Sequence, residues 1–491
     1  MRLSELTKGY ALKPGAGDPE ITLVTEDSRR VRPGALFVAI AGTTRDGHAF
    51  VREALDRGAA AVVVERPEAA PPGAAAHAIA PSTRRALAVL ASRFHGNPAT
   101  GLSVIGFTGT FGKTTTSDIL RALFEAAGRR PAVIGSLGAR FEDFYDRGDG
   151  LTTPAPPQLQ EWLSAVRERG ARTVIVEVTS HALRLERVHG LKFDGGLIAA
   201  VMPGEHTDFH RTYDDYVAAK RLFLDHLRPE ATLAFDADNR AARTLGLEAP
   251  VATRAGMTFS GRGEASVFLE SAVFDDRGVS LTVRSTFFDG RADVRSALLG
   301  RRNARNAGLA LAYAVAAGIP METAREVLER LQPLRRRMER FDVSGRTVLD
   351  DTAGHPDSLH AVFEVVGMLR RERLIVVWAI RGGRGPHINT AIASALADLA
   401  SEHGAEELIV TAAADEVEPK DRVRAGEVDA ARAALDARGR RYVFEETLER
   451  AMARTAACSR AGDLVVLAGA QGMNEGRRLL HQVLLDEQRP R

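Results

Sequence analysis

The stretch that most constrains the fold of this chain is an apolar run that enters a glycine turn and continues as a helical pattern. Residues 105–116 read IGFTGTFGKTTT, and the apolar residues from 116 onward recur with helical spacing. A strand, a glycine turn and a helix in this order present free backbone N–H groups and the positive end of the helix to an anion. The stretch therefore predicts a phosphate-binding turn inside an α/β sheet.

The spacing of the glycines indicates which kind of phosphate loop this is. The common P-loop pattern needs a glycine five residues before Gly112 of the Gly-Lys pair, and Phe107 stands there. The pattern T-G-T-x-G-K-T-T fits instead, with Gly109 in the turn, Lys113 within reach of the terminal phosphates and the Thr114 hydroxyl as a magnesium ligand. The alternative is an ordinary glycine-rich βα turn, which the Gly-Lys-Thr-Thr run after a hydrophobic strand argues against.

Strand-like apolar runs alternate with helical patterns along the whole chain, among them GALFVAI, RTVIVEV, RLIVVWAI and GDLVVLAG. This alternation predicts an α/β fold with mostly parallel sheets and helices on both faces. A length of 491 residues suggests about three domains at ~150 residues each. We predict an N-terminal α/β domain over 1–97, a central P-loop ATPase-type domain over 98–334 and a C-terminal Rossmann-like domain over 335–491.

Composition excludes several other classes of protein. Lys and Arg number 66 against 64 Asp and Glu, so no overall basic field points to nucleic acid. The single cysteine, Cys458, excludes a disulfide framework and a zinc site built from cysteines. The first residues contain no signal-peptide core, and no apolar run has the length of a membrane span. We therefore expect a soluble cytoplasmic protein that binds neither nucleic acid nor membrane.

Two stretches further along carry candidate metal ligands. Glu177 stands in EVTSHAL near the end of a strand, and His206, His210 and Lys220 follow in EHTDFHRTYDDYVAAK. The two histidines at i and i+4 could suggest zinc, but the glutamate that a zinc protease carries after the first histidine is missing. Taken singly, each residue would be an ordinary polar or solvated side chain. With a phosphate loop upstream they favour magnesium-dependent phosphoryl transfer, which uses a loop hydroxyl and nearby carboxylates.

Several motifs, in one order along nearly the whole chain, resemble those of the Mur ligase family. The stretch DSRRVRPGALFVAIAGTTRDGHAF resembles the family's uridine-binding N-terminal domain. The family's central ATPase domain has motifs similar to TGTFGKTTT, TTP, EVTSHAL, EHTDFH with YVAAK, and GRRNARNA. Its C-terminal domain has motifs similar to RRMERF and DDTAGHPDSL. The resemblance implies an ATP-dependent, ADP-forming amide ligase of peptidoglycan biosynthesis, in the branch that adds the third amino acid to UDP-N-acetylmuramoyl-L-alanyl-D-glutamate.

The same resemblance assigns catalytic, nucleotide-binding and metal-binding residues. Lys113 and Thr114 would hold the β- and γ-phosphates and one magnesium ion, and Glu177 would bridge two ions. His206 would bind the second ion, and Lys220 would be the family's carbamylated lysine, in which added CO₂ turns a cation into a carboxylate. The implied cofactors are ATP, two Mg²⁺ ions and carbamylated Lys220. The assigned nucleotide-binding set is Gly109, Thr110, Gly112, Lys113, Thr114, Thr115, Asn303, Asn306, Arg337 and Asp351.

The implied chemistry passes the γ-phosphoryl of ATP to a substrate carboxylate. An amine then attacks the acyl phosphate, and phosphate leaves from a tetrahedral intermediate. The implied partners are small molecules, a UDP-muramoyl-peptide and an amino acid, bound by a monomer. The residues assigned to the uridine and muramoyl-dipeptide are Ser28, Arg29, Gly47, His48, Thr152, Thr153, Thr179 and Arg187.

The chain also departs from the family pattern. Phe111 stands where the family usually has asparagine, and Arg336 replaces a glycine. The stretch DDTAGHP puts Thr352 and Gly354 where tyrosine and histidine are expected, with His355 one step later. The GGDRD-like turn becomes RGGRGPHIN, and Gly-Lys-Gly-His-Glu becomes GAQGMNEG.

The largest change concerns the acceptor amino acid. Members that add diaminopimelate carry Asp-Asn-Pro-Arg, whose arginine reads the distal carboxylate, whereas TAAADEVEP contains no arginine. An unpaired buried carboxylate would be unfavourable by about 1–3 kcal/mol or more, so we expect lysine or ornithine rather than meso-diaminopimelate. Asp415, Glu416 or Glu475 could meet the side-chain ammonium. The candidate acceptor residues are Arg381, Arg384, Asp415 and Glu475.

Two other functions stay open. The ligase chemistry could serve another biosynthetic pathway, although the retained uridine-binding motifs argue for a UDP substrate. The chain could also be a nucleotide-binding regulatory protein without ligase activity, as Phe111 and the altered C-terminal motifs would suggest. Retention of Lys113, Glu177 and Lys220 argues against that alternative.

Overall fold

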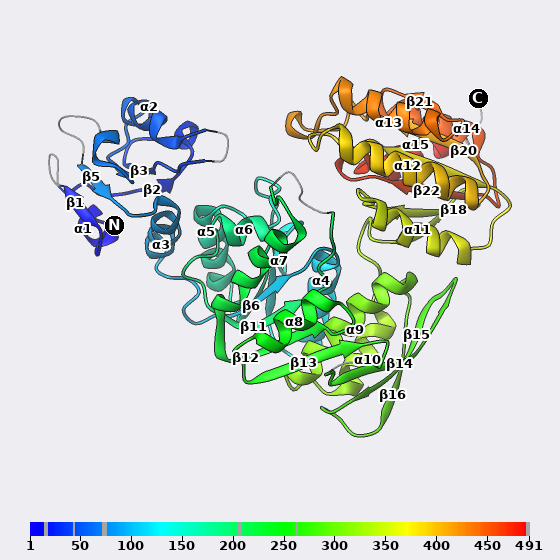
Figure 1. The fold of residues 1–491 in the computed structure, drawn as a ribbon, viewed down its shortest axis with the longest axis horizontal. Coiled ribbons are helices and arrows are strands. Elements are labelled where there is room, and N and C mark those ends of the chain that lie inside the picture. The colour runs from blue at the N-terminus through cyan, green and yellow to red at the C-terminus, as the bar shows by residue number, and fades with distance from the viewer. Residues whose placement is uncertain (14–17, 43–44, 71–75, 205–208, 262–263, 488–491) are drawn as a thin grey trace. The chain divides into compact units, whose positions relative to one another are not determined.

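The computed structural model describes residues 1–487 apart from 14–17, 43–44, 71–75, 205–208 and 262–263 (Figure 1). The described strands form three sheets, met one after another along the chain. The chain divides into two compact units. The first comprises residues 1–268, 285–288 and 309–324, and the second 269–284, 289–308 and 325–491.

The first sheet has five strands in the order β1-β5-β4-β3-β2. Strands β2 to β5 are parallel, and β1 pairs antiparallel with β5. β3 and β4 are buried along their whole length, as their apolar runs predict. The bounds are β1 Ala11–Lys13, β2 Leu23–Thr25, β3 Ala35–Val38, β4 Ala61–Val64, β5 Ala76–Ile79, α1 Leu3–Leu6, α2 Val51–Asp56, α3 Thr83–Phe94, and the 3-10 turns η1 Ser28–Arg30, η2 Gly47–Phe50 and η3 Pro67–Ala69.

The second sheet has eleven strands in the order β16-β15-β14-β13-β12-β11-β6-β10-β7-β8-β9. The strand before the phosphate loop, β6, lies between β11 and β10 and is parallel to both. β8 and β9 pair antiparallel at one edge, as do β15 and β16 at the other. The bounds are β6 Ser103–Thr108, β7 Pro131–Gly135, β8 Gly138–Phe141, β9 Phe144–Asp146, β10 Thr173–Glu177, β11 Phe193–Ile198, β12 Leu227–Asp236, β13 Thr253–Thr258, β14 Val267–Asp275, β15 Gly278–Ser285 and β16 Arg291–Ser296.

Helices alternate with these strands as the sequence predicts. The Gly-Ile-Pro of residues 318–320 separates two helices, since proline favours the start of a helix over its interior. The bounds are α4 Lys113–Ala126, α5 Pro156–Glu168, α6 Ser180–Arg184, α7 Tyr213–Arg221, η4 Leu222–His226, α8 Arg240–Glu248, α9 Gly300–Ala316 and α10 Met321–Arg330.

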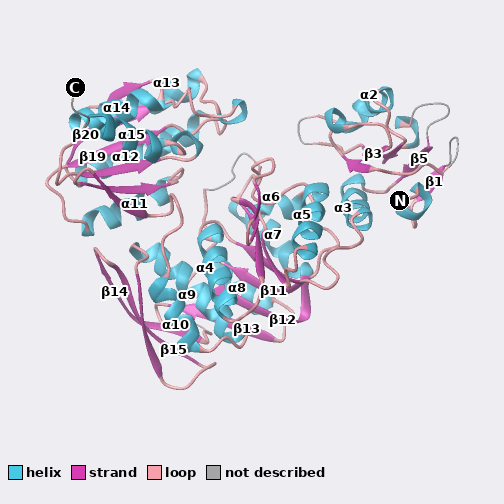
Figure 2. Cartoon of the chain, turned by 180° about the vertical axis from the view of Figure 1, so that it is seen from behind, coloured by secondary structure: helices cyan, strands magenta, loops and turns pink. Residues whose placement is uncertain are grey.

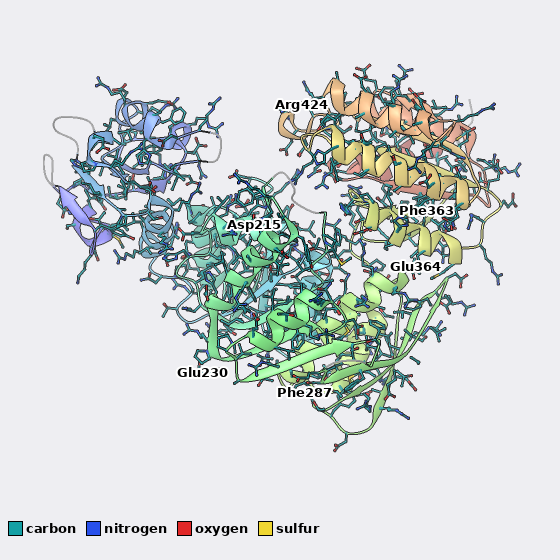
Figure 3. The ribbon with its side chains drawn as sticks, viewed as in Figure 1. Asp215, Glu230, Phe287, Phe363, Glu364 and Arg424 are labelled. Atoms are coloured by element: carbon teal, nitrogen blue, oxygen red, sulfur yellow. The ribbon has the colours of Figure 1, made fainter. Side chains whose placement is uncertain are left out.

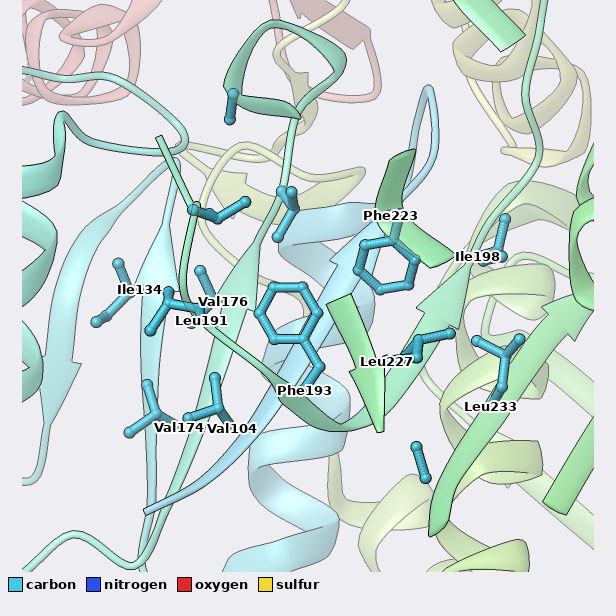
Figure 4. Close-up of a cluster of buried hydrophobic side chains, with 14 of the residues drawn as sticks. Val104, Ile134, Val174, Val176, Leu191, Phe193, Ile198, Phe223, Leu227 and Leu233 are labelled. Carbon is cyan, nitrogen blue, oxygen red and sulfur yellow. The ribbon is translucent and has the colours of Figure 1, made fainter. Parts of the chain in front are cut away.

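The packing around β6 requires a glycine within that strand. Phe193 on β11 and Phe223 stack with their ring centroids 5.3 Å apart, inside the cluster of buried side chains in Figure 4. A Cβ atom on Gly106 would lie 2.6 Å from Phe223 Cε2 and 2.7 Å from Phe193 Cδ2, closer than carbon atoms approach. The aromatic pair therefore packs directly on the β6 backbone, just before the phosphate loop begins.

The third sheet has six strands in the order β17-β18-β22-β19-β20-β21, all parallel except β17. Apolar side chains of α11, α12 and α13 share one core cluster, and those of α14 and α15 share another, so helices cover both faces (Figure 2). The bounds are β17 Glu339–Val343, β18 Arg346–Asp351, β19 Leu374–Ala379, β20 Ala405–Thr411, β21 Val443–Glu445, β22 Leu464–Ala468, α11 Pro356–Met368, α12 Pro386–Glu402, α13 Ala425–Ala437, α14 Leu448–Cys458, α15 Gly476–Glu487, η5 Pro419–Asp421 and η6 Gln471–Met473.

The predicted fold class, three α/β parts with mostly parallel sheets, is confirmed. The domain boundaries at 97 and 334 stay predictions. Within the part of the chain that the structure describes, every helix is too short or too polar to cross a membrane.

Candidate active site

The phosphate loop joins β6 to α4 and depends on two glycines. Gly109 has φ 148°, and Gly112, the N-cap of α4, has φ 84° in the left-handed region. A Cβ atom on Gly109 would lie 2.7 Å from Ala199 Cβ. Lys113 opens α4, and its Nζ donates to Gly109 O at 2.9 Å and Thr110 O at 3.1 Å. A turn, a helix start and an ammonium group therefore meet in the arrangement that binds phosphate.

Glu177 ends β10, the strand beside β6, and its carboxylate lies against the first turn of α4. Thr114 Oγ1 and Ser136 Oγ each donate to Oε2 at 3.1 Å, and Ser136 N donates to Oε1 at 3.3 Å. Gly135 leaves the room for this carboxylate, because a Cβ atom there would lie 2.2 Å from Oε1. Burial raises the pKa of Glu177, while the nearby Lys113 ammonium and the hydrogen bonds act in the opposite direction.

The donor set beside the loop fits magnesium. Mg²⁺ prefers oxygen ligands, and the Thr114 hydroxyl and the Glu177 carboxylate are adjacent. A bound cation would also stabilise the charge of a carboxylate whose burial raises its pKa. Among the described residues, here or elsewhere, no group of three or more His, Cys, Asp or Glu side chains could hold a metal. His206, the predicted second-metal ligand, lies outside the described residues.

Lys220 reaches the same loop from α7. Its side chain is 1% exposed, and its Nζ donates to Gly109 O at 2.9 Å and lies 4.7 Å from the centroid of the Tyr216 ring. Lys113 and Lys220 therefore donate to one carbonyl oxygen. Lys220 thus contacts the phosphate loop, and its catalytic role, metal ligation and carbamylation stay predictions.

Tyr216, one helical turn before Lys220, is a site residue that sequence analysis missed. Its hydroxyl lies 3.0 Å from Thr110 Oγ1, an oxygen that also accepts a hydrogen bond from Met202 N at 2.9 Å. Tyr216 thereby anchors the phosphate loop to α7. The available signal was the i, i+4 spacing of Tyr216 and Lys220, which puts both on one helix face.

His210 ties α6 to α7. Its Nε2 lies 2.9 Å from Ser180 Oγ, and its Nδ1 lies 3.5 Å from Asp215 Oδ2. Asp215 stands on α7, where Figure 3 labels it, and also pairs with Arg184. Burial lowers the pKa of His210, which favours the neutral ring in this contact.

The four residues assigned to the muramoyl-dipeptide gather around Glu177. Thr153 Oγ1 donates to Glu177 O at 2.8 Å and accepts from Thr179 N at 3.1 Å. Arg187 Nη1 donates to Thr153 O at 2.9 Å, and burial lowers the pKa of Arg187. Thr152 Oγ1 lies 2.9 Å from the serine hydroxyl that contacts the Glu177 carboxylate. The structure thus joins all four to Glu177, directly or through one neighbour, and their contact with substrate stays a prediction.

The residues assigned to uridine follow the carboxyl ends of two neighbouring parallel strands, β2 and β3. Ser28 and Arg29 lie in η1, and Gly47 and His48 begin η2. His48 Nδ1 lies 2.6 Å from Asp46 Oδ1, and its Nε2 accepts from the backbone N–H of residue 65 at 3.1 Å. A Cβ atom on Gly47 would lie 2.6 Å from a backbone oxygen. Gly47 and His48 therefore shape their own turn, and their contact with uridine stays a prediction.

In the second unit, the two asparagines assigned to adenine lie one turn apart on α9. Asn306 Nδ2 donates to Asn303 Oδ1 at 3.2 Å, and both side chains are buried. Asn303 Nδ2 has no hydrogen-bond partner among the described residues. A buried amide left unpaired is unfavourable unless a ligand supplies the acceptor. Asn303 Nδ2 is therefore available to a ligand acceptor atom, and the contact of the pair with adenine stays a prediction.

Arg337 and Asp351 meet at the end of β18. Asp351 Oδ2 accepts from Met338 N at 2.9 Å, and Arg337 Nη1 donates to Thr352 Oγ1. Burial raises the pKa of Asp351, against the effect of the Arg337 guanidinium. The closure of this pair over ATP stays a prediction.

The acidic candidates for the acceptor site are all engaged within the protein. Asp415 accepts from the first two backbone N–H groups of α14, at 2.7 and 3.1 Å, and so caps that helix. Glu416 and Glu475 both pair with Arg478, at 3.4 and 2.8 Å. The sequence shows the acidic side chains of this region, whereas the pairing of Glu416 and Glu475 with Arg478 depends on the fold.

Arg381 and Arg384 lie in the loop after β19, which is closed around the Glu427 carboxylate. Arg381 Nη1 donates to Gly354 O at 2.6 Å. Burial disfavours the charge of Glu427, but four backbone N–H groups hold its pKa below the usual range. The donors are the N–H groups of Gly383, Arg384, Gly385 and Arg424, at 2.7–3.3 Å.

The sequence matches three descriptions of one family along its length. The Mur ligase family catalytic domain matches residues 20–95, the Mur ligase middle domain matches 107–314, and the Mur ligase glutamate ligase domain matches 336–471.

Two curated relatives span most of the chain. The UDP-N-acetylmuramyl-tripeptide synthetase of Roseiflexus sp. (strain RS-1) is 35% identical over 496 residues, which cover 96% of this chain and 94% of the relative. The UDP-N-acetylmuramoyl-L-alanyl-D-glutamate–2,6-diaminopimelate ligase of Bacillus licheniformis is 35% identical over 420 residues, 82% of each chain.

Solved structures share the fold. A UDP-N-acetylmuramoyl-L-alanyl-D-glutamate–2,6-diaminopimelate ligase matches with a TM-score of 0.65 at 22% identity, covering 96% of both chains. Folylpolyglutamate synthase of Mycobacterium tuberculosis, complexed with ADP and AMPPCP, matches with a TM-score of 0.61 at 16% identity, covering 80% of this chain and 93% of that one. With family matches in order along the chain and relatives at 35% identity over most of it, the chain belongs to the Mur ligase family of ATP-dependent ligases.

Proposed function

We propose that this enzyme adds the third amino acid to UDP-N-acetylmuramoyl-L-alanyl-D-glutamate in peptidoglycan biosynthesis, forming ADP and phosphate. The names of both curated relatives support this donor. The observation that carries the proposal is the joining of two assigned sites at Glu177, whose carboxylate accepts from Thr114 of the phosphate loop and whose carbonyl accepts from Thr153 of the dipeptide set. A cytoplasmic, monomeric enzyme acting on small molecules is part of the same proposal.

The roles of the residues follow from this geometry. Lys113 and the start of α4 would neutralise the phosphate oxygens. Thr114 and Glu177 would hold magnesium, which when bound stabilises charge on the transferred phosphoryl group. Arg187, joined to Thr153, would orient the substrate carboxylate that receives the phosphoryl group. The acceptor amine then attacks the acyl carbon, loses a proton and displaces phosphate.

We also propose that Lys220 works as a carbamate. A buried ammonium against the Gly109 carbonyl adds to the positive charge of Lys113, whereas a carbamate would give the magnesium site another oxygen ligand. Lys220→Ala is expected to lose activity about 100-fold or more and to regain part of it with added acetate. The matched control is Lys192→Ala, whose ammonium donates to Asp225 O at the surface, and it should keep activity within about twofold. Full activity of Lys220→Ala would contradict the assignment.

For the acceptor we propose lysine or ornithine. The relative from Bacillus licheniformis is named for diaminopimelate, but the stretch TAAADEVEP offers no arginine to its distal carboxylate. Glu416 and Glu475 pair with Arg478, whose side chain is 52% exposed. A cationic acceptor side chain could replace that arginine as their partner.

The test is a screen of amino acids with ATP and the UDP-muramoyl-dipeptide, followed by phosphate release and product mass. Lysine or ornithine should give at least about tenfold higher kcat/KM than meso-diaminopimelate. A preference for diaminopimelate would overturn the acceptor assignment alone. Phosphate release that needs no UDP-substrate would point to a ligase of another pathway, and nucleotide binding without turnover would point to a regulatory protein.

A further inference from the structure

Several departures from the family pattern meet at one buried guanidinium. Arg336 is 4% exposed, and its Nε donates to Asp350 Oδ1 at 3.1 Å. Its Nη1 donates to Asn474 Oδ1 at 2.6 Å and Ala470 O at 2.8 Å, and its Nη2 donates to Gly469 O. One side chain thus joins the end of β18 to the segment that follows β22.

The backbone of Arg336 is held in an unfavourable conformation. Its φ is 59°, in the left-handed region where a residue with a long side chain is strained and where glycine is not. The family pattern has glycine at this position. A strained conformation persists only where surrounding contacts offset it. The backbone of Arg336 contributes such contacts, since its N–H donates to Glu339 Oε2 at 3.0 Å and its carbonyl accepts from Thr352 N at 3.1 Å. The hydrogen bonds of its guanidinium add to them.

The segment held by Arg336, residues 469–474, lies where ligands bind in sheets of this kind. β22 stands between β18 and β19, which precede it in the chain. The helix after β19 covers one face of the sheet and the helix after β22 covers the other. Open α/β sheets bind ligands outside the carboxyl ends of their strands at such a point of reversal.

The neighbouring loop after β19 belongs to the same assembly. Arg381 donates to Gly354 O, and a Cβ atom on Gly354 would lie 3.3 Å from Arg381 Nη1 and 3.5 Å from Ala470 Cβ. A Cβ atom on Gly472 would lie 3.0 Å from Ala379 Cβ. The loops after β18, β19 and β22 therefore pack on one another at this edge.

We propose that Arg336 is a positioning residue for the acceptor amino acid. It holds residues 469–474 in the conformation that forms one wall of the acceptor pocket and touches neither ATP nor the reacting atoms. This proposal rests on the proposed function, because the acceptor is the amine of that reaction. The guanidinium of Arg336 hydrogen-bonds to Asp350 and to residues 469–474, and to neither Arg337 nor Asp351, the adjacent residues assigned to ATP. Loss of the guanidinium should therefore weaken use of the acceptor selectively.

Steady-state kinetics with Arg336→Ala and Asn474→Ala test the proposal. Both variants should raise the KM for the acceptor amino acid about tenfold or more, with the KM values for ATP and the UDP-substrate within about twofold. Arg336→Lys, which keeps a cation beside Asp350, should recover part of the loss. The matched control is Arg346→Ala, at the opposite end of β18, whose guanidinium donates to Ser459 Oγ and to two carbonyl groups. It should leave all three KM values within about twofold.

Amide hydrogen exchange without ligands gives a second readout that does not need turnover. In Arg336→Ala, residues 469–474 should exchange faster than in the parent enzyme, whereas Arg346→Ala should leave them unchanged. Equal rises in all three KM values, or unchanged exchange of this segment, would overturn the proposal. If the parent enzyme accepts no amino acid with the UDP-muramoyl-dipeptide, the proposed function fails, and the exchange result still decides whether Arg336 holds the segment.

Discussion

Asp350 is a buried carboxyl group, and only one of its two oxygen atoms accepts a hydrogen bond within the described part of the chain. Oδ1 accepts from Arg336, while Oδ2 has no hydrogen-bond partner among the described residues. Burial raises the pKa of Asp350 to about 6, and the Arg336 guanidinium opposes that rise. The folded protein therefore binds a proton here over a range of pH in which the unfolded chain has already released it.

This proton makes stability fall as the pH rises. Between the usual value of 3.8 and about 6, the folded state binds more protons than the unfolded state, so the free energy of unfolding decreases through that window and is flat above it. Asp350→Asn should remove a decrease on the order of 2–3 kcal/mol. Denaturant unfolding of both proteins from pH 4 to pH 8 measures the difference. A difference that does not change with pH would contradict the raised pKa.

At the scale of elements, the loop after β19 is organised by a carboxylate from another helix. Glu427, on α13, is 2% exposed and accepts from backbone N–H groups in that loop. Glu427→Gln keeps the shape but replaces one accepting oxygen by a donor, so it should lower the free energy of unfolding by about 1–3 kcal/mol at pH 7. The measurement is denaturant unfolding. Asp398→Asn, which removes one member of an exposed ion pair with Arg438, serves as the control and should stay within about 0.5 kcal/mol.

The dependence of this effect on pH has the opposite sign to that of Asp350. Because the pKa of Glu427 is lowered in the folded state, its contribution is fully present above the usual value of 4.5 and is lost as the pH falls through the folded value. The difference between parent and Glu427→Gln should therefore shrink as the pH falls below the usual value of 4.5. A difference that grows on acidification would exclude the charged carboxylate as its cause.

Elements formed by neighbouring residues were predictable from the sequence. The β6 strand, its glycine turn and α4 follow from one continuous pattern, and so do the two helices separated at residues 318–320. Tyr216 was not predicted as a site residue, because its hydroxyl contacts Thr110, more than a hundred residues away. The pairing of Glu416 with Arg478 was not predicted for the same reason, since the two residues meet only through the fold.

At the scale of the whole molecule, assigned residues in each sheet lie at the carboxyl ends of parallel strands. His48 follows β3, Lys113 follows β6, Glu177 ends β10 and Asp351 ends β18. The order of motifs could be read from the sequence because each motif is attached to its own strand. The sequence could not reveal which assigned side chains form hydrogen bonds or ion pairs within the protein. These contacts depend on partners that the fold brings together from distant parts of the chain.

The contacts of Arg336 also bear on how this chain can change. Its guanidinium, the Asp350 carboxyl, the 469–474 segment and the close approach at Gly354 depend on one another. Restoring the family's glycine at 336 alone would leave a buried carboxyl without its cation and a loop without its anchor, which is destabilising. Restoring a side chain at Gly354 alone would place its Cβ atom 3.3 Å from Arg381 Nη1, so the Arg381 side chain would have to move. These substitutions are therefore epistatic, and a chimera with a relative should exchange them as one set.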